Sequence, residues 1–591
     1  MSNELAGMGA IRAEQGFAFR VWAPHADAVS IFGEFNDWDT GADPLTDEGN
    51  GYWYGHVGSA RVGQEYKFWI THGENSFARR DPYSHQVTNS VGNSVLYDHA
   101  DFDWEGNNAH CPPHHELVIY ELHVGTFNNG PDADGTLFDV IDRLDHLTDL
   151  GINCIQIMPV AEFAGDMSWG YNPSDPFAVE SSYGGPDALK SLVKACHERG
   201  ISVIQDVVYN HFGPSDLDLW HFDGWSENDL GGIYFYNDWR SHTPWGDTRP
   251  DYGREEVRRY IRDNALMWLR DYHMDGLRLD MTPYMRSVDA TELNLPEGWS
   301  LMRWLAETVR EEFPGRIIIA EDLHGDPAVT SSDDGGAWFH AQWDSQFVHP
   351  VREALEETRD EWRSLAEVSD ALTHTYGDAF ARVIYTESHD EVANGRARVP
   401  ASVDEGDQSG WAAQKRSTLG AALMLTAPGI PMLFQGQEYL EGGWFRDDVP
   451  LDWRRRDDYA GIANLYADLI SLRLNRWGHS RGLTGAHIDV FHADESTNLL
   501  AHHRWAEGGP GDSVVVVANL SAQALESQRI GLPAGGTWTL RFNSDAPMYS
   551  SLFGHVESYD LDAHPDGADG LNFHADVTIA PYSVLVYSQQ P

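Results

Sequence analysis

Short apolar runs alternate with amphipathic segments between residues 117 and 440, and this alternation constrains the fold more than any other feature. Eight of the runs are typical of buried parallel strands: LVIYELHVGTF, INCIQIMPV, ISVIQDVVY, DGLRLD, RIIIAED, HAQWDSQF, ARVIYTESHD and PMLFQGQEY. Between them lie segments such as LFDVIDRLDHLTDLG and DALKSLVKACHERG, whose apolar residues recur at helical spacing before a glycine. Eight strand–helix repeats predict a (β/α)8 TIM barrel.

Strand patterns without helices lie on both sides of this region. FAFRVWAP, AVSIFGEF, GYWYGHV and EYKFWITH alternate apolar and polar residues before it, and SVVVVANLS, TWTLRF and SVLVYS follow it. We therefore expect an α/β protein with three domains: an N-terminal β-sandwich at residues 1–104, the barrel at 115–480 and a C-terminal β-sandwich at 485–591. The polar, proline-containing stretch HCPPHHE marks the first boundary.

Four of the expected barrel strands end in a carboxyl group. These residues are Asp206, Asp280, Glu321 and Asp390, and His211, Arg278 and His389 lie beside them in the sequence. A single acidic residue after an apolar run is usually a helix cap or a turn former. Four in succession point to an acid site, because barrel enzymes carry their catalytic residues at the carboxyl ends of the strands.

The carboxyl groups differ in their expected surroundings. Arg278 lies two positions before Asp280, so both side chains face the same side of a strand, and the guanidinium favours an ionised nucleophile. Glu321 ends the apolar run RIIIAE, where a raised pKa would suit a general acid. Two such carboxyl groups about 5–5.5 Å apart are the equipment of a retaining glycosidase or transglycosylase. Asp390 would then hold substrate hydroxyls in the transition state.

The remaining candidates are expected to bind the substrate. They are Trp169, Tyr171, Asp206, His211, Arg278 and His389. Asp206 and Asn210 stand four apart on the third strand, so both can face the pocket, and the imidazoles can donate hydrogen bonds to sugar hydroxyls. Aromatic rings in SWGYNP could support a sugar ring, although a packed loop is an equally ordinary explanation for Trp169.

Composition narrows the class of partner. The chain of 591 residues carries a formal net charge of −52, from 92 Asp and Glu against 40 Lys and Arg. Such a balance repels nucleic acid and anionic membranes, so we expect neither as a partner and expect a neutral substrate instead. The acidic residues are spread along the chain. This favours two interpretations equally: a halophilic surface, or a genome that encodes moderately acidic, arginine-rich proteins.

Localisation signals are missing from the sequence. MSNELAGMGAIRAEQG lacks the basic and apolar regions of a secretory signal, and no window holds the ~18 consecutive apolar residues of a membrane span. Cys111, Cys154 and Cys196 are odd in number and lack metal-ligand spacing, which suits a reducing interior. The sequence therefore predicts a cytoplasmic enzyme and leaves its oligomeric state open.

The segments DVVYNH, GLRLD, IIAED and ESHDEV resemble the four ordered motifs of the α-amylase clan, glycoside hydrolase family 13. This resemblance runs from the first expected barrel strand through the C-terminal sandwich. It implies that Asp280 is the nucleophile, Glu321 the acid/base and Asp390 the transition-state stabiliser. Around the reacting sugar it places Asp206, His211, Arg278 and His389. The segment FRVWAPHADAVSIFGEFNDWD is similar to the glycogen-binding type of module that precedes the barrel in branching and debranching members.

Two kinds of family member resemble this chain most. GEFNDW, AEDLHGDP, SHDEV, PLDW and Met285, five residues after the implied nucleophile, are similar to 1,4-α-glucan branching enzymes. IYELHVGTF, DVVYNHFGP and HTPWG are similar to maltooligosyltrehalose trehalohydrolases. The fourth motif decides for branching, because trehalohydrolases typically have NHDQ where this chain has Ser388, His389, Asp390 and Glu391.

Three alternatives stay open beside branching. They are trehalose release, amylase-type hydrolysis, which DVVYNH resembles, and binding of glucan without catalysis. The expected partner is an α-glucan or a maltooligosaccharide. No cofactor is expected, and no obligatory metal, because the sequence has no dense loop of carboxylates.

Overall fold

The structure is a computed structural model, and it describes residues 7–107, 111–130, 135–165, 167–291 and 293–590. Residues 1–6, within the segment in which we expect no secretory signal, and His110 of HCPPHHE lie outside the described residues. The chain divides into two compact units. Unit 1 comprises Met1–His110, His123–Asp142 and Ile157–Glu321, and unit 2 comprises Cys111–Leu122, Arg143–Gln156 and Asp322–Pro591.

A closed barrel of eight strands forms the centre of the fold, in the order β10-β11-β14-β15-β16-β17-β18-β19. The strands are β10 (Ile119–Leu122), β11 (Cys154–Ile157), β14 (Ser202–Val207), β15 (Gly276–Leu279), β16 (Ile317–Ala320), β17 (Ala341–Trp343), β18 (Arg382–Ile384) and β19 (Ile430–Phe434). Their paired registers are parallel, and every residue in them is buried. The predicted (β/α)8 barrel is confirmed, since each of the eight apolar runs supplies one strand.

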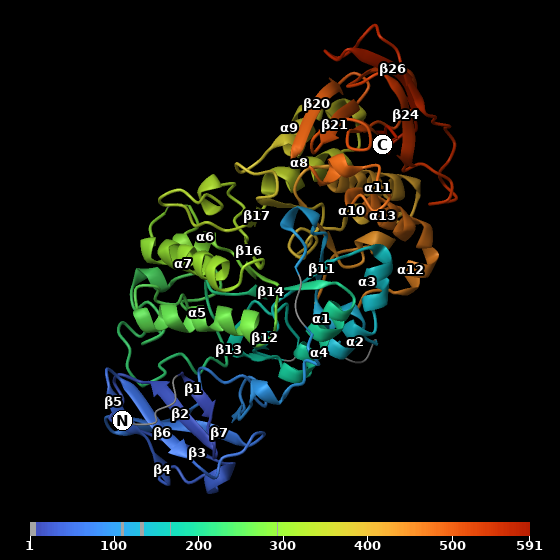
Figure 1. The fold of residues 1–591 in the computed structure, drawn as a ribbon. Coiled ribbons are helices and arrows are strands. Elements are labelled where there is room, and N and C mark those ends of the chain that lie inside the picture. The colour runs from blue at the N-terminus through green and yellow to red at the C-terminus, as the bar shows by residue number, and fades with distance from the viewer. Residues whose placement is uncertain (1–6, 108–110, 131–134, 166, 292, 591) are drawn as a thin grey trace. The chain divides into compact units, whose positions relative to one another are not determined.

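Helices occupy the segments between the strands (Figure 1). Unit 1 contains α1 (Val124–Phe127), α2 (Leu137–Ile141), α4 (Gly185–Glu198), α5 (Glu255–Arg270), α6 (Pro283–Arg286) and α7 (Pro296–Glu312). Unit 2 contains α3 (Leu144–Leu150), α8 (Ser345–Glu356), α9 (Leu365–Thr373), α10 (Val399–Val403), α11 (Trp411–Thr426), α12 (Arg454–Asp458) and α13 (Ala460–Arg473). Within unit 1, α7 packs on β16 and on α5.

Two segments differ from their expected form. LVIYELHVGTF is a strand only over Ile119–Leu122, and its last residues form the short helix α1. The expected continuous helix over residues 137–151 is divided into α2 and α3, because Arg143 leaves the helical backbone with φ −112° and ψ 2°. Gly151 then ends α3 at φ 96°, a left-handed conformation that favours glycine.

The N-terminal β-sandwich in unit 1 is also confirmed. Its sheets have the orders β1-β2-β6-β5 and β4-β3-β7-β8, with β9 paired to β7. The strands are β1 (Gly9–Arg12), β2 (Phe17–Trp22), β3 (Ala28–Gly33), β4 (Asp43–Pro44), β5 (Thr46–Gly49), β6 (Tyr52–Val57), β7 (Glu65–His72), β8 (Asn75–Arg79) and β9 (Ser94–Val95). Phe19 on one sheet contacts Tyr66 on the other, with ring centroids 5.4 Å apart, so the alternating aromatic residues fill the core. A separate hairpin of β12 (Ala161–Phe163) and β13 (Pro173–Val179) follows the second barrel strand.

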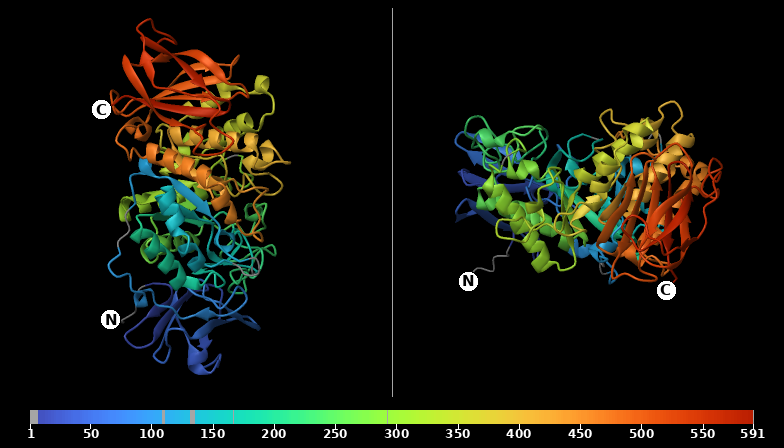
Figure 2. Two further views of the ribbon diagram at one scale, coloured as in Figure 1. Left: turned by 90° about the vertical axis from the view of Figure 1, so that its right-hand side faces the viewer. Right: turned by 90° about the horizontal axis from the view of Figure 1, so that it is seen from above.

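The C-terminal β domain in unit 2 has a six-stranded sheet, β20-β21-β22-β27-β24-β25, and a two-stranded sheet, β23-β26. It is the red part of the ribbon in both views of Figure 2. Its strands are β20 (His487–Asp494), β21 (Leu499–Trp505), β22 (Val514–Asn519), β23 (Leu525–Leu532), β24 (Gly536–Asn543), β25 (Leu561–Ala563), β26 (Phe573–Ile579) and β27 (Ser583–Ser588). Apolar residues from both sheets form one buried core that includes Val515, Ile530 and Trp538. Within the part of the chain that the structure describes, no helix has the length and apolar character needed to cross a membrane.

Candidate active site

One buried guanidinium joins three of the predicted site carboxylates in unit 1. Strands β14 and β15 place Asp206 directly beside Arg278, and Nη1 of Arg278 donates to both Asp206 oxygens at 2.8 and 2.7 Å. The same nitrogen donates to Oδ1 of Asp280 at 3.1 Å, and Nη2 donates to Oε2 of Glu321 at 2.7 Å. Burial alone would lower the pKa of Arg278, but Asp206 and Glu321 raise it well above its ordinary value.

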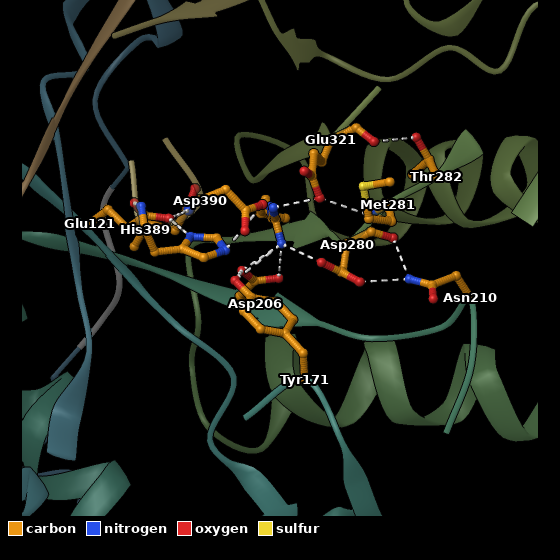
Figure 3. Close-up of polar contacts among 12 residues, drawn as sticks. Glu121, Tyr171, Asp206, Asn210, Asp280, Met281, Thr282, Glu321, His389 and Asp390 are labelled. Atoms are coloured by element: carbon orange, nitrogen blue, oxygen red, sulfur yellow. Dashed lines mark hydrogen bonds and ion pairs between the residues drawn. The ribbon is translucent and has the colours of Figure 1, made fainter. Parts of the chain in front are cut away.

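Asp280 is held on its other side by Asn210. The amide nitrogen Nδ2 of Asn210 donates to Oδ2 of Asp280 at 2.7 Å and to its main-chain oxygen at 2.9 Å (Figure 3). Each carboxylate oxygen of Asp280 therefore accepts a hydrogen bond from a different buried side chain. This arrangement fixes the direction of the carboxylate before any substrate arrives, which is what a nucleophile requires.

Glu321 has polar contacts that the apolar run RIIIAE does not indicate, and its expected raised pKa stays a prediction. Besides Arg278, the main-chain N–H of Met281 donates to Oε2 of Glu321 at 2.8 Å. Met281 has φ 38°, a strained left-handed conformation for a residue with a side chain, and it directly follows Asp280. One guanidinium therefore contacts all three carboxylates, and it reaches Glu321 at the same oxygen that accepts from the main chain of Met281.

Tyr171 and His211 extend this cluster. The hydroxyl of Tyr171 donates to Oδ2 of Asp206 at 2.8 Å, and the main-chain oxygen of Tyr171 lies 2.9 Å from Nε2 of His211. The other ring nitrogen of His211 contacts Oδ1 of Asn210. Burial lowers the pKa of His211 to about 4, so its ring is neutral at pH 7 and its single N–H can donate to only one of these two oxygens.

An aromatic residue outside the predicted set lies against His211. The indole of Trp245 stacks on the imidazole with centroids 4.7 Å apart and planes 13° apart, and it meets Tyr284 edge-on at 5.2 Å. Trp245 is 38% exposed, which is unusual for a large apolar side chain held between two rings. The sequence indicates an exposed position for Trp245 only through the turn residues proline and glycine on either side of it in HTPWG.

A second cluster in unit 2 contains the remaining acidic strand end. Glu121 in β10 is fully buried and accepts from the main-chain N–H of His389 at 2.9 Å, while its other oxygen lies 2.8 Å from Nδ1 of the same residue. Asp390 is 3.6 Å from Nε2 of His389, and its side chain is 46% exposed (Figure 3). Sequence reasoning missed Glu121. Its signal was a lone carboxylate inside the otherwise apolar start of the first barrel strand.

Each predicted site residue lies in one of the two units of the chain. Unit 1 brings together Tyr171, Asp206, His211, Arg278, Asp280 and Glu321, and unit 2 brings together His389 and Asp390. Trp169 is half-buried in the segment between β12 and β13. The catalytic and binding roles of these residues stay predictions. Among the described residues, no group of three or more His, Cys, Asp or Glu side chains is arranged to hold a metal ion.

Family models match most of the chain. "Alpha amylase, catalytic domain" matches residues 122–229 and 221–453, "Carbohydrate-binding module 48 (Isoamylase N-terminal domain)" matches residues 7–84, and "Alpha amylase, C-terminal all-beta domain" matches residues 490–590. The last two fall within the N-terminal β-sandwich and the C-terminal β domain.

Individual proteins are similar over nearly the whole chain. A 1,4-alpha-glucan branching enzyme from Corynebacterium jeikeium is 30% identical over 98% of this chain and 82% of its own length. One from Salinibacter ruber is 29% identical over 98% of this chain and 96% of its own. Among solved structures, the pullulanase from Paenibacillus barengoltzii in complex with maltohexaose and α-cyclodextrin has a similar fold. Its TM-score is 0.77 at 21% identity, over 100% of this chain and 96% of that one.

Proposed function

We propose that this chain, which belongs to the α-amylase family, is a 1,4-α-glucan branching enzyme. It is a glycoside hydrolase or transglycosylase by family. The proposed reaction cuts an α-1,4 linkage and transfers the released glucan segment to a 6-hydroxyl. One observation carries the proposal: Arg278 and Asn210 hold Asp280 from two sides, beside a second carboxyl group on the same guanidinium.

In the first step, an oxygen of Asp280 attacks the anomeric carbon of the donor sugar. The bond between that carbon and the glycosidic oxygen breaks, and Glu321 gives its proton to the departing oxygen. The products are a glycosyl ester on Asp280 and a shortened glucan. Asp206 and Tyr171, which are hydrogen-bonded to each other, are proposed to bind hydroxyls of the reacting sugar.

In the second step, the ionised Glu321 takes the proton from a 6-hydroxyl as its oxygen attacks the anomeric carbon. The ester bond to Asp280 breaks, a new α-1,6 linkage forms, and both carboxyl groups return to their starting state. Retention of the α configuration requires two inverting displacements at the same carbon, which fits one nucleophile and one acid/base. Asp390, with its exposed carboxylate, is proposed to bind donor hydroxyls as positive charge develops.

Water competes with the acceptor sugar for the glycosyl ester. Trp245 and Tyr284 offer an aromatic contact beside His211, and such a surface favours a sugar ring over water. The fourth motif, with Glu391 after Asp390, and the similarity to 1,4-alpha-glucan branching enzymes also support transfer over hydrolysis.

The test is the fate of amylose. Transfer should lower the iodine colour while the number of reducing ends stays nearly constant, and a debranching enzyme should then release new linear chains. Reducing ends that rise in step with the loss of colour would make the chain a hydrolase. Trehalose released from a maltooligosyltrehalose would make the chain a trehalohydrolase. If no substrate is turned over at all, glucan binding without catalysis is the remaining function.

A further inference from the structure

Asp390 lies between two residues whose side chains are each held by another element of unit 2. His389, which precedes it, contacts Glu121 of β10 through its main-chain N–H and its ring (Figure 3). Glu391, which follows it, has Oε1 3.1 Å from Nε2 of His349 in helix α8. The carboxylate of Asp390 is 46% exposed, so its position depends on the backbone that these two neighbours restrain.

Two basic side chains hold the carboxylate of Glu391, which is only 10% exposed. Besides His349, Arg396 has Nη1 3.5 Å from Oε2, and the main-chain N–H of Glu391 donates to Oγ of Ser388 at 3.2 Å. The guanidinium contact is longer than an ordinary hydrogen bond, and Arg396 is 66% exposed. His349 therefore makes the closer of the two side-chain contacts, and a charged imidazole holds Glu391 more strongly than a neutral one.

His349 can change its charge near neutral pH. Its side chain is 57% exposed, so it exchanges protons with water. The hydrogen bond to Glu391 raises the pKa of His349 above its ordinary value, against the opposing effects of burial and of the charges of Arg396 and Arg352. Burial would raise the pKa of Glu391, but the hydrogen bond and the charge of His349 bring it below its ordinary value. Because the pKa of His349 is raised in the folded protein, the attraction is complete at low pH and is lost as the pH rises through that pKa.

A cavity of about 710 Å³ borders His349 and Glu391 and contains the other charged groups near them. These further charged residues of the lining are Arg352, Glu353, Glu356, Glu357 and Arg396. Helix α10, which packs on α8, contributes Ser402, and among the described residues neither α9 nor α11, which also pack on α8, contributes to the lining. His349 is thus the one histidine of the described lining, and histidine is the side chain whose ordinary pKa lies near neutrality.

We propose that His349 is a positioning residue for Asp390, which restrains Glu391 and through it the backbone that carries the Asp390 carboxylate. The inference rests on the proposed function, because it assumes that Asp390 binds donor hydroxyls as the glycosyl ester forms. Protonated His349 holds Glu391 by charge and by a hydrogen bond, whereas neutral His349 holds it by a hydrogen bond alone. Formation of the ester should therefore slow as His349 loses its proton.

Fluoride release from maltosyl fluoride separates this effect from the ionisation of Glu321. The value of kcat/KM for this donor reports formation of the glycosyl ester alone, and fluoride leaves without a proton. Between pH 6 and pH 9, kcat/KM should fall by about 3- to 10-fold in the unmodified protein, which is less than the about 10²-fold that a misplacement of 1 Å can cost. His349→Gln cannot become charged, so it should have the lower value of kcat/KM at both pH values.

His349→Lys is the rescue variant, because an ammonium group keeps its charge up to pH 9 and can pair with Glu391. It should keep the higher kcat/KM at pH 6 and show no fall by pH 9. His492→Gln is the matched control, because His492 lies 3.1 Å from Asp569 in the C-terminal β domain, and it should behave as the unmodified protein does. The proposal is overturned if His349→Gln still shows the fall, or if His349→Lys behaves like His349→Gln.

NMR of protein labelled with ¹³C-histidine measures the pKa of His349 without turnover, and the signal that is lost in His349→Gln assigns it. This pKa should lie above the ordinary value of about 6.5 and fall toward it in Glu391→Gln, which keeps a hydrogen bond but no charge. A pKa that is unchanged in Glu391→Gln would contradict the pairing on which the proposal depends. Fluoride release does not depend on the acceptor, so a failure of amylose branching would leave this inference standing, and the two proposals fail separately.

Discussion

Replacement of Arg278 by methionine tests how the site carboxylates are held together. Arg278 is fully buried, and its guanidinium contacts Asp206, Asp280 and Glu321. Methionine keeps an unbranched buried side chain but leaves these carboxylates without their shared cation. The side chains of Asp206 and Glu321 are 0% exposed in the unliganded protein, so both depend on Arg278 as the partner of their charge. Removing one partner of a buried ion pair costs about 3–5 kcal/mol, and we expect the free energy of unfolding at pH 7 to fall by that amount.

The loss should depend on pH in a defined direction. Without the guanidinium, the pKa values of Asp206 and Glu321 in the folded variant rise above their unfolded values of about 3.9 and 4.3. The folded variant then binds more protons than its unfolded chain, so it regains stability as the pH falls through the raised pKa values. The difference from the unmodified protein should therefore be largest at pH 7 and smaller at pH 5.

Urea-induced unfolding followed by tryptophan fluorescence at pH 7 and pH 5 measures this difference. Arg446→Met is the matched control, because Arg446 pairs with Asp448 at the surface, where their side chains are 45% and 41% exposed. Exposed ion pairs contribute little to the free energy of unfolding, because water solvates and screens both charges. If Arg278→Met is as stable as the control at pH 7, or if its loss is equal at both pH values, the reasoning is refuted.

Five further outcomes are expected. Asp280→Asn should lower kcat by roughly 10⁴-fold or more. Glu321→Gln should still be glycosylated by maltosyl fluoride, because fluoride leaves without a proton. If this variant loses equal activity with amylose and with maltosyl fluoride, Glu321 is not the acid. Glu121→Gln should lower kcat about 10- to 100-fold with little change in KM, because His389 loses a charged partner. Unchanged steady-state kinetics would show that Glu121 does not position His389. Trp245→Ala should raise the ratio of hydrolysis to transfer, measured as reducing ends per new branch, and a constant ratio would remove Trp245 from acceptor binding. The melting temperature should rise from low salt to molar potassium chloride, because salt screens surface repulsion over a Debye length of about 10 Å at 0.1 M; an unchanged value would dismiss the halophilic surface.

The barrel was predictable because its strands are buried on both faces. Such strands are continuous apolar runs that need no knowledge of their neighbours, and all eight were visible in the sequence. The position of Asp280 and Arg278 on one strand was predictable for a similar reason, since period-two alternation is a local property. The break at Arg143 was not, because both halves of that segment have helical spacing and only the backbone of one residue departs.

Contacts between distant segments could not be predicted locally. Glu121 meets His389 across 268 residues of sequence, and no pattern near either residue reports the other. Glu321 illustrates the same limit. Its own run is apolar, but the pairing of β15 with β16 brings the guanidinium of Arg278 to it. A run of residues predicts its own strand, but the polar contacts of a residue at the end of that strand depend on the neighbouring strand in the barrel.

Transfer of a glycosyl group from Asp280 to a 6-hydroxyl leaves the total number of glycosidic bonds unchanged. Proton NMR of amylose incubated with the protein counts α-1,4 linkages, α-1,6 linkages and free reducing ends in one spectrum. We expect the α-1,6 signals to grow by as much as the α-1,4 signals decline, while the reducing-end signals stay constant. Decline of the α-1,4 signals matched by growth of the reducing-end signals, with no α-1,6 signal, would contradict transfer.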